Sequence, residues 1–186
     1  MSTITVLCSL IFNTYAYELQ IGKLTGGIAN RKYYIGISDQ TYVSDCAAAM
    51  NAWNYAVQNT PETANMGFNF TRTYTESQAA LRFYCENAPN QGFTGLTRYY
   101  FYNSDGSITE ASDAYHRDYA SLILNTAILN RKPEYIKSVA GHEAGHGMGL
   151  KHNPTNIGTL MFQGADKRTA TVPTRDDVLG IYEKYS

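Results

Sequence analysis

Three of the four histidines in this 186-residue chain fall within one short segment. They are His142, His146 and His152, in the pattern H-E-x-x-H-x-x-G-x-x-H. On an α-helix, residues four apart lie about 40° apart around the axis and about 6 Å along it, so the first two imidazoles project from one face. Three protein ligands with an open fourth position are typical of a catalytic zinc site. The spacing therefore predicts one catalytic zinc ion bound by these histidines.

The third ligand must approach the metal from a direction that the same helix does not offer. Gly149 lies between the second and third histidines and can adopt a positive φ angle, which allows the helix to end in a sharp turn. We therefore predict that Gly149 is the helix break and that the turn brings His152 back to the metal.

Glu143 follows the first histidine and points to a neighbouring sector of the helix, beside the open metal position. Zinc lowers the pKa of a bound water to about 7, and a carboxylate placed there accepts the proton as the water attacks a carbonyl. The five fixed residues of the pattern would occur by chance in fewer than about one in 10⁵ chains of this length. We interpret Glu143 as the catalytic general base.

Hydrophobic periodicity predicts the elements that must hold this site. Alternating apolar residues predict strands, and spacing of three and four predicts helices. The expected fold is a single α+β domain with a twisted, mostly parallel-type sheet of about five strands. One long helix crosses the sheet early, a second carries the histidines, and a third begins at a capping box and closes the chain. The predicted strands are 32–38, 66–70, 81–85, 96–102 and 119–125, and the predicted helices start at Thr41 or Ser44, at Pro133 and at Thr174.

The charge balance excludes some classes of protein. The formal net charge is −1 with no run of like charge, which argues against a nucleic-acid binder and against docking on an acidic membrane surface. No stretch approaches eighteen apolar residues, so stable membrane insertion is not expected. We expect a monomer.

The first residues resemble a secretion signal. An apolar stretch, Ile4 to Phe12, is followed by the small-x-small pattern Thr14-Tyr15-Ala16. We therefore predict a signal peptide over 1–16, a short segment over 17–31, a catalytic domain with the histidine motif over 32–186, and a secreted or extracytoplasmic location. The alternative is that the apolar stretch is a buried first strand.

The cysteine count fits an exported protein. Cleavage after Ala16 would leave Cys46 and Cys85, and a disulfide between them would close a loop of about forty residues. Such a bridge stabilises a fold by roughly 4 kcal/mol in the chain-entropy model. The alternative is a pair of buried free thiols in a cytosolic protein.

The histidine motif resembles that of the metzincins, and the chain is most similar to a matrixin catalytic domain. The similarity includes Tyr33-Tyr-Ile-Gly-Ile, Leu81-Arg-Phe, Leu122-Ile-Leu-Asn and Asp176-Asp-Val-Leu-Gly-Ile-Tyr. It implies that Met161 forms the methionine turn beneath the metal. Asn153 and Gln163 differ from the residues that astacins carry at these positions. Asp176 and Asp177 match matrixin carboxylates that tie the last helix to the methionine turn, although they could simply be charges at a helix N-terminus.

The resemblance also implies how a substrate binds. An extended protein or peptide would pair with the strand over 96–102, and the side chain after the scissile bond would enter a pocket walled by 162–173. A second, structural zinc of the matrixin kind is not expected, because His116 is the only other histidine and we interpret it as a surface or supporting residue. Calcium could bind near Asp105, Asp113 and Asp118, but no EF-hand spacing supports it.

These features predict a secreted zinc-dependent endopeptidase. One alternative is a zinc hydrolase that acts on a non-protein amide, and another is a secreted binding protein that retains the zinc site as a scaffold. A third is a gluzincin, which would use the first two histidines with a glutamate from a later helix and leave His152 free.

Overall fold

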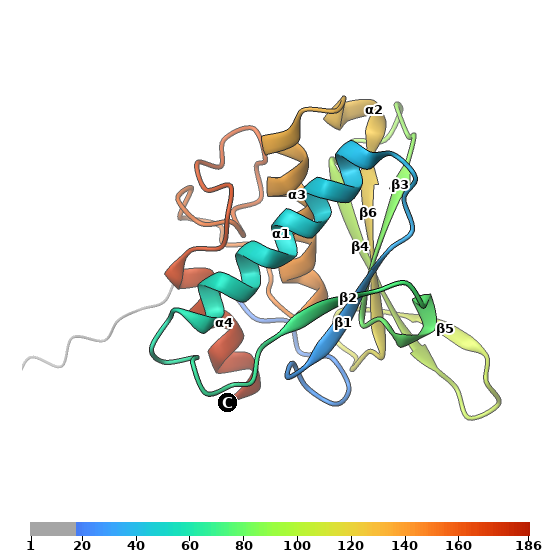
Figure 1. Cartoon of the computed structure of the whole chain (residues 1–186), viewed down its shortest axis with the longest axis vertical. Coiled ribbons are helices and arrows are strands. Elements are labelled where there is room, and N and C mark those ends of the chain that lie inside the picture. The colour runs from blue at the N-terminus through green and yellow to red at the C-terminus, as the bar shows by residue number, and fades with distance from the viewer. Residues whose placement is uncertain (1–17) are drawn as a thin grey trace, which may run out of the picture.

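The computed structural model describes residues 18–186, in which a mixed sheet lies beside three longer helices (Figure 1). The predicted signal peptide and its cleavage site lie outside the described residues. The strands are β1 (Arg31–Ile35), β2 (Phe70–Thr73), β3 (Leu81–Glu86), β4 (Gly95–Tyr102), β5 (Ile108–Ala111) and β6 (Tyr119–Asn125). The helices are α1 (Gln40–Gln58), α2 (Thr126–Leu129), α3 (Pro133–Gly147) and α4 (Arg175–Tyr185), with a 3₁₀ turn at Glu76–Gln78.

The sheet has the strand order β2-β1-β3-β6-β4-β5. The four strands β2, β1, β3 and β6 run parallel to one another, β4 runs antiparallel to β6, and β5 pairs antiparallel with β4. The prediction of an α+β fold with a mostly parallel sheet is therefore confirmed. Strand β2 begins at Phe70, where the strand predicted over 66–70 was expected to end. Strand β5 was not predicted, because its residues are exposed or half-buried and show no apolar alternation.

Strand β4 is only partly covered on its outer side. Pairing with β5 involves Tyr99 to Tyr102, whereas pairing with β6 extends over Gly95 to Tyr100. The first half of β4, Gly95 to Arg98, therefore has no strand on its outer side within the described residues. The sequence predicted an edge strand over 96–102. The unpaired edge is shorter than that strand, because β5 pairs with its second half.

The two long helices α1 and α3 pack against each other beside the sheet (Figure 1). The indole nitrogen of the fully buried Trp53 in α1 donates a hydrogen bond to the carbonyl oxygen of Gly141 in α3, at 2.9 Å. The α1 N-cap is Asp39, whose carboxylate accepts from the Thr41 backbone N–H. The prediction of Thr41 or Ser44 as the cap was therefore wrong by a few residues, since Asp39 precedes them with an equally good capping side chain.

Helices α3 and α4 begin where the sequence predicts. Pro133 occupies the first turn of α3, where its missing N–H costs nothing. The capping box at the start of α4 is formed by Thr174 and Asp177, and both of its reciprocal hydrogen bonds are present. The N-terminal residues of α3 and α4 therefore set where these helices begin. Helix α3 contains the first two histidines, and α4 packs against the segment that follows them.

The expected disulfide is absent. Cys46 is a buried free thiol in α1, and Cys85 is a partly buried free thiol near the end of β3. Burial raises the pKa of both thiols, that of Cys85 to about 12, so neither is reactive as a thiolate. An even cysteine count gives no information on whether two sulfur atoms have the geometry that a disulfide requires, and the prediction was wrong on this point. No helix in residues 18–186 is both long and apolar enough to cross a membrane.

Candidate metal centre

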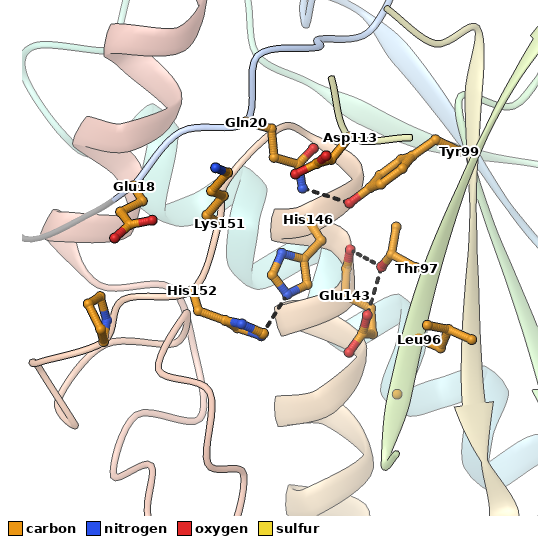
Figure 2. A pocket seen from close by; sticks show the side chains of 12 residues that line it. Glu18, Gln20, Leu96, Thr97, Tyr99, Asp113, Glu143, His146, Lys151 and His152 are labelled. Atoms are coloured by element: carbon orange, nitrogen blue, oxygen red, sulfur yellow. Dashed lines mark hydrogen bonds between the residues drawn. The ribbon is translucent and has the colours of Figure 1, made fainter. Parts of the chain in front are cut away.

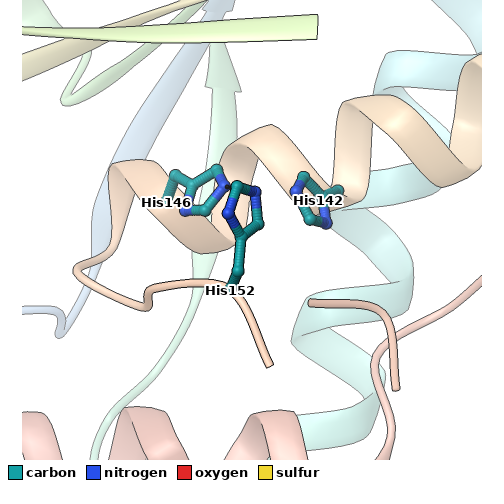
Figure 3. A group of neighbouring side chains, drawn as sticks. All are labelled: His142, His146 and His152. Atoms are coloured by element: carbon teal, nitrogen blue, oxygen red, sulfur yellow. Dashed lines mark hydrogen bonds between the residues drawn. The ribbon is translucent and has the colours of Figure 1, made fainter. Parts of the chain in front are cut away.

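The three histidines converge on one point beside α3 (Figure 3). One nitrogen from each ring can be chosen so that all three lie within 4.8 Å of one another. The Nε2 atoms of His146 and His152 are 3.1 Å apart. Two ligands of a tetrahedral zinc ion with bonds of 2.0–2.1 Å should be about 3.3 Å apart, so this arrangement fits one metal ion.

Backbone carbonyls orient the two helical imidazoles. The Nδ1 atom of His142 lies 2.7 Å from the Leu160 carbonyl oxygen, and Nδ1 of His146 lies 2.8 Å from that of Leu150. For His146 we assign the ring proton to Nδ1, since a carbonyl only accepts, and this leaves Nε2 free as a ligand atom. The Nδ1 atom of His142 lies 2.8 Å from Nη1 of Arg168 as well, and a guanidinium only donates, so the two neighbours of this ring favour opposite tautomers. Burial lowers the pKa of His142 well below its ordinary value and that of His146 to about 4. Both rings are therefore neutral near pH 7, as metal ligands must be.

Helix α3 ends in a turn that returns the chain to the metal centre. The Leu150 N–H bonds to the Gly145 carbonyl and the Gly149 N–H to the His146 carbonyl, which is the pattern of a Schellman motif. Gly149 has a φ angle of +107°, in the region that favours glycine. This turn places His152 opposite His146 (Figure 3).

Glu143 points from α3 toward the first half of β4 (Figure 2). Its carboxylate accepts a hydrogen bond of 2.7 Å from the Thr97 hydroxyl. Burial raises the pKa of the Glu143 carboxyl to about 7, against the Thr97 hydrogen bond and the Arg168 charge, which both lower it. A Cβ atom on Gly95 would lie 2.5 Å from the carboxylate, so a glycine is needed for this close approach. The carboxylate is thus held rigidly beside the metal centre.

Met161 lies beneath α3 and is fully buried. A Cβ atom on Gly145 would lie 2.3 Å from the Met161 sulfur and 3.3 Å from the Trp53 ring. The helix can therefore approach the methionine this closely only because position 145 has no side chain. Met161 supports the helix turn between the first two histidines.

We expect Gly145→Ala to destabilise the protein by about 1–2 kcal/mol. The added methyl group overpacks the contact with Met161, which costs roughly 1–3 kcal/mol, and the better helix propensity of alanine offsets up to about 1 kcal/mol of that. Urea unfolding measures the change. Gly92→Ala is the matched control, because no atom lies within 4 Å of its added Cβ atom. A variant at 145 as stable as this control would contradict the packing.

Two carboxylates link α4 to the segments around the metal centre. Asp177 is buried and accepts from the backbone N–H groups of Leu160 and Met161, at 3.0 and 3.1 Å, and from Thr174. Asp176 accepts from the side-chain amide of Asn153 at 3.0 Å. These are the ties that the resemblance implied, and they go beyond simple charges at a helix N-terminus.

We expect Asp177→Asn to destabilise the protein by roughly 2–3 kcal/mol. An amide nitrogen cannot accept the hydrogen bonds that one carboxylate oxygen now receives, and hydrogen bonds to a charged group contribute about 1.5–3 kcal/mol. Denaturant unfolding measures the loss. The exposed Asp166→Asn should change stability by less than about 0.5 kcal/mol. Equal stability of the two variants would show that Asp177 does not hold the methionine turn.

Arg168 was not identified from the sequence, yet it is buried against the metal centre. Its Nη1 atom donates to the Leu160 carbonyl at 3.0 Å and to the Phe162 carbonyl at 3.3 Å. Its Nε and Nη2 atoms both donate to the Ser138 hydroxyl, at 3.2 and 2.8 Å. Burial lowers the pKa of this guanidinium, but arginine stays protonated at physiological pH. A permanent positive charge therefore lies beside the first histidine.

Two cavities open on either side of His152. The front cavity has a volume of about 470 Å³ and is bounded by the N-terminal segment, the first half of β4 and the turn after α3 (Figure 2). The rear cavity has a volume of about 260 Å³ and lies between α3, the loop before β4 and the segment after Met161. Both share Gly95, Glu143 and His152, so together they form one cleft across the metal centre.

The remaining predicted site residues lie elsewhere. His116 is exposed, and its Nδ1 atom accepts from the Lys23 backbone N–H at 3.3 Å. Asp105 accepts from Ser107 within a local turn, and Asp118 accepts from the backbone N–H of Tyr102 at the end of β4. Within residues 18–186, the histidine triad is the group arranged to hold a metal ion. We do not predict a calcium site.

Comparison with known proteins identifies a family and a shared fold. The matrixin model matches residues 28–186 of the chain. No curated protein sequence matches the chain significantly. Among solved structures, a chain in the GM1-bound form of the ECX AB5 holotoxin is similar, with a TM-score of 0.54 and 13% sequence identity. The alignment covers 90% of this chain and 88% of that one, which shows a shared fold and nothing further.

Proposed function

The chain belongs to the matrixin family of peptidases, and on that premise we propose that it is a zinc-dependent endopeptidase. Three histidines would hold the zinc ion, with Glu143 as general base. The observation that carries the proposal is the convergence of the histidine nitrogens beside the Glu143 carboxylate, within one open cleft. A scaffold that only bound zinc would need the histidines but not a buried, oriented carboxylate next to them.

The chain's own residues supply the proton transfers of the reaction. Bound zinc supplies a Lewis acid that polarises the scissile carbonyl and makes water more acidic. The Glu143 carboxylate accepts a proton as the water oxygen attacks the carbonyl carbon, and later delivers it to the leaving amine nitrogen. Thr97 holds one oxygen of this carboxylate, which leaves the other available. The C–N bond breaks without a covalent acyl-enzyme.

The first half of β4 is the segment that would align the substrate. Gly95 to Arg98 lacks a partner strand on its outer side in the described residues, and it borders both cavities. An extended peptide would add to this edge through backbone hydrogen bonds. The three or four residues available match a short stretch of peptide centred on the metal, so we propose protein or peptide substrates bound in an extended conformation.

We further propose that the N-terminal segment over 18–31 forms part of the catalytic unit. Leu19 bridges to Leu150, and the Gln20 backbone N–H bonds to the Gly149 carbonyl. The buried Gln20 side chain also donates to the Tyr99 hydroxyl and the Leu150 carbonyl, at 2.6 and 3.0 Å. Secretion through residues 1–16 remains a prediction, which the size and N-terminal sequence of the exported product would test.

A cleavage assay separates the proposed function from its alternatives. The purified protein is incubated with a denatured protein and with a panel of small non-protein amides, with and without a zinc chelator. We expect chelator-sensitive cleavage of the denatured protein at internal peptide bonds. Hydrolysis of the amides alone would favour a non-protein substrate. Bound zinc without hydrolysis of either class would favour a binding protein.

A further inference from the structure

The rear cavity contains a positive charge that no carboxylate neutralises at close range. Arg168 lines this cavity, and none of the ion pairs within residues 18–186 includes its guanidinium. The acidic groups that act on it electrostatically are Glu143 and Asp177. Asp177 is already engaged by backbone N–H groups, and Glu143 by Thr97. A buried charge without a direct partner is costly.

A structural role explains only part of this arrangement. The hydrogen bonds to Ser138, Leu160 and Phe162 attach the segment after Met161 to α3. Neutral donors could make several of these contacts without placing a charge in the interior. The contacts with Ser138, Leu160 and Phe162 use four of the five N–H groups of the guanidinium, and its Nη1 atom also lies 2.8 Å from Nδ1 of His142. The positive charge and one N–H group on Nη2 therefore remain for a ligand in the cavity.

The position of the cavity identifies the ligand. It shares Glu143 and His152 with the catalytic cleft, and its far wall is the segment after Met161, where the resemblance places the side chain that follows the scissile bond. A volume of about 260 Å³ accommodates one side chain of moderate size. The positive charges of Arg168 and a bound metal ion would favour an anion there, and the remaining Nη2 N–H group of Arg168 can donate a charge-assisted hydrogen bond to a carboxylate.

We propose that Arg168 is a specificity-determining residue that binds a carboxylate of the peptide substrate, carried by the residue after the scissile bond. This inference rests on the proposed endopeptidase function and names its substrate class. An acidic side chain is one source of the carboxylate, and the C-terminal α-carboxylate of a short peptide is the other. Arg168 lies on the cavity wall, and its Nη1 atom is also 2.8 Å from Nδ1 of His142, so a change at this position must be checked for its effect on bound zinc.

The test compares peptides that differ only in the charge of one residue. Internally quenched peptides carry Glu, Gln, Asp or Asn after the cleaved bond, with amidated ends, and kcat/KM is measured for each with the zinc-loaded protein. We expect the better of the acidic peptides to be cleaved roughly 10- to 100-fold faster than its neutral amide counterpart, because a charged hydrogen bond is made only with the acid. A second pair ends at this residue with a neutral side chain and either a free or an amidated C-terminus.

Variants assign the preference to Arg168. Arg168→Gln should reduce the preference for the carboxylate to within about twofold, and Arg168→Lys should retain part of it, because lysine keeps the charge but not the planar fork. Arg72→Gln removes an exposed arginine from β2 and should keep the full preference. Zinc content and thermal unfolding verify that each variant is folded and loaded. The wild-type comparison of acid and amide needs no variant, so loss of folding at position 168 would not remove the test.

Each outcome has one meaning. A preference for the internal acidic peptides supports the proposal with a side-chain carboxylate. A preference for the free C-terminus alone supports carboxylate binding by Arg168, but it would replace endopeptidase cleavage with removal of the terminal residue. Equal cleavage of acids and amides in both pairs would overturn it, as would a preference that Arg168→Gln leaves intact. If no peptide is cleaved at all, the endopeptidase function itself fails, and this inference fails with it.

Discussion

Replacing Glu143 with alanine should abolish peptide hydrolysis and leave zinc bound. The carboxylate is the acidic group that borders both cavities together with His152, and Thr97 holds it in one orientation. Without it, no side chain at that position accepts the proton of the attacking water. We expect kcat/KM to fall at least 100-fold, the scale typical of a lost general base. Steady-state cleavage of a quenched peptide measures the activity, and elemental analysis measures the zinc.

Two further variants sharpen the interpretation. Glu143→Gln retains the size and the Thr97 contact but not the basicity, and should be as inactive as the alanine variant. Glu134→Gln is the matched control, since this exposed glutamate lies in the first turn of the same helix and pairs only with Lys137. It should keep wild-type activity. More than about 1% of wild-type activity in Glu143→Ala would exclude this residue as the base.

Replacing His152 with alanine should remove the metal and, with it, the activity. This imidazole closes the triad from outside the helix, and its Nε2 atom is 3.1 Å from that of His146. Removal of residues that merely orient zinc ligands lowers metal affinity about 10- to 100-fold, so loss of a ligand should lower it by more than about 100-fold. Competition with a chromogenic zinc chelator measures the affinity.

The fourth histidine provides the control for this change. His116 is exposed and accepts only a backbone hydrogen bond from Lys23, so His116→Ala should bind zinc as tightly as the wild type. Wild-type zinc affinity in His152→Ala would instead favour the gluzincin arrangement, in which a glutamate from a later helix completes the site. Equal losses in both variants would indicate that neither histidine acts as a specific ligand.

The parts of the site that lie close together in sequence were predictable. The spacing of His142 and His146 follows from helix geometry, and Gly149 supplies the positive φ angle that the following turn needs. The family resemblance extended this to Met161 and to Asp177, whose contact with the methionine turn crosses sixteen residues of sequence. These residues were predictable because they follow either the repeat of an α-helix or a sequence pattern that matrixins share.

The parts that depend on long-range packing were not predictable. Thr97 meets Glu143 only because β4 lies beside α3, and a threonine in a β-rich stretch gives no sign of such a contact. Arg168 lies in a segment without periodicity, so its burial against Ser138 could not be inferred. The Cys46–Cys85 prediction was wrong for a related reason: an even number of cysteines does not determine the distance between two sulfur atoms, which depends on the folded chain.

Restoring zinc to the metal-free protein tests the central claim most directly. The protein is stripped with a chelator and dialysed, zinc is added in steps, and the cleavage rate of a quenched peptide is followed together with bound zinc. We predict no cleavage without metal, a rate that rises in proportion to bound zinc, and a plateau at one zinc ion per chain. Full activity of the stripped protein, or no activity with one zinc ion bound, would contradict the assignment of this chain as a zinc-dependent endopeptidase.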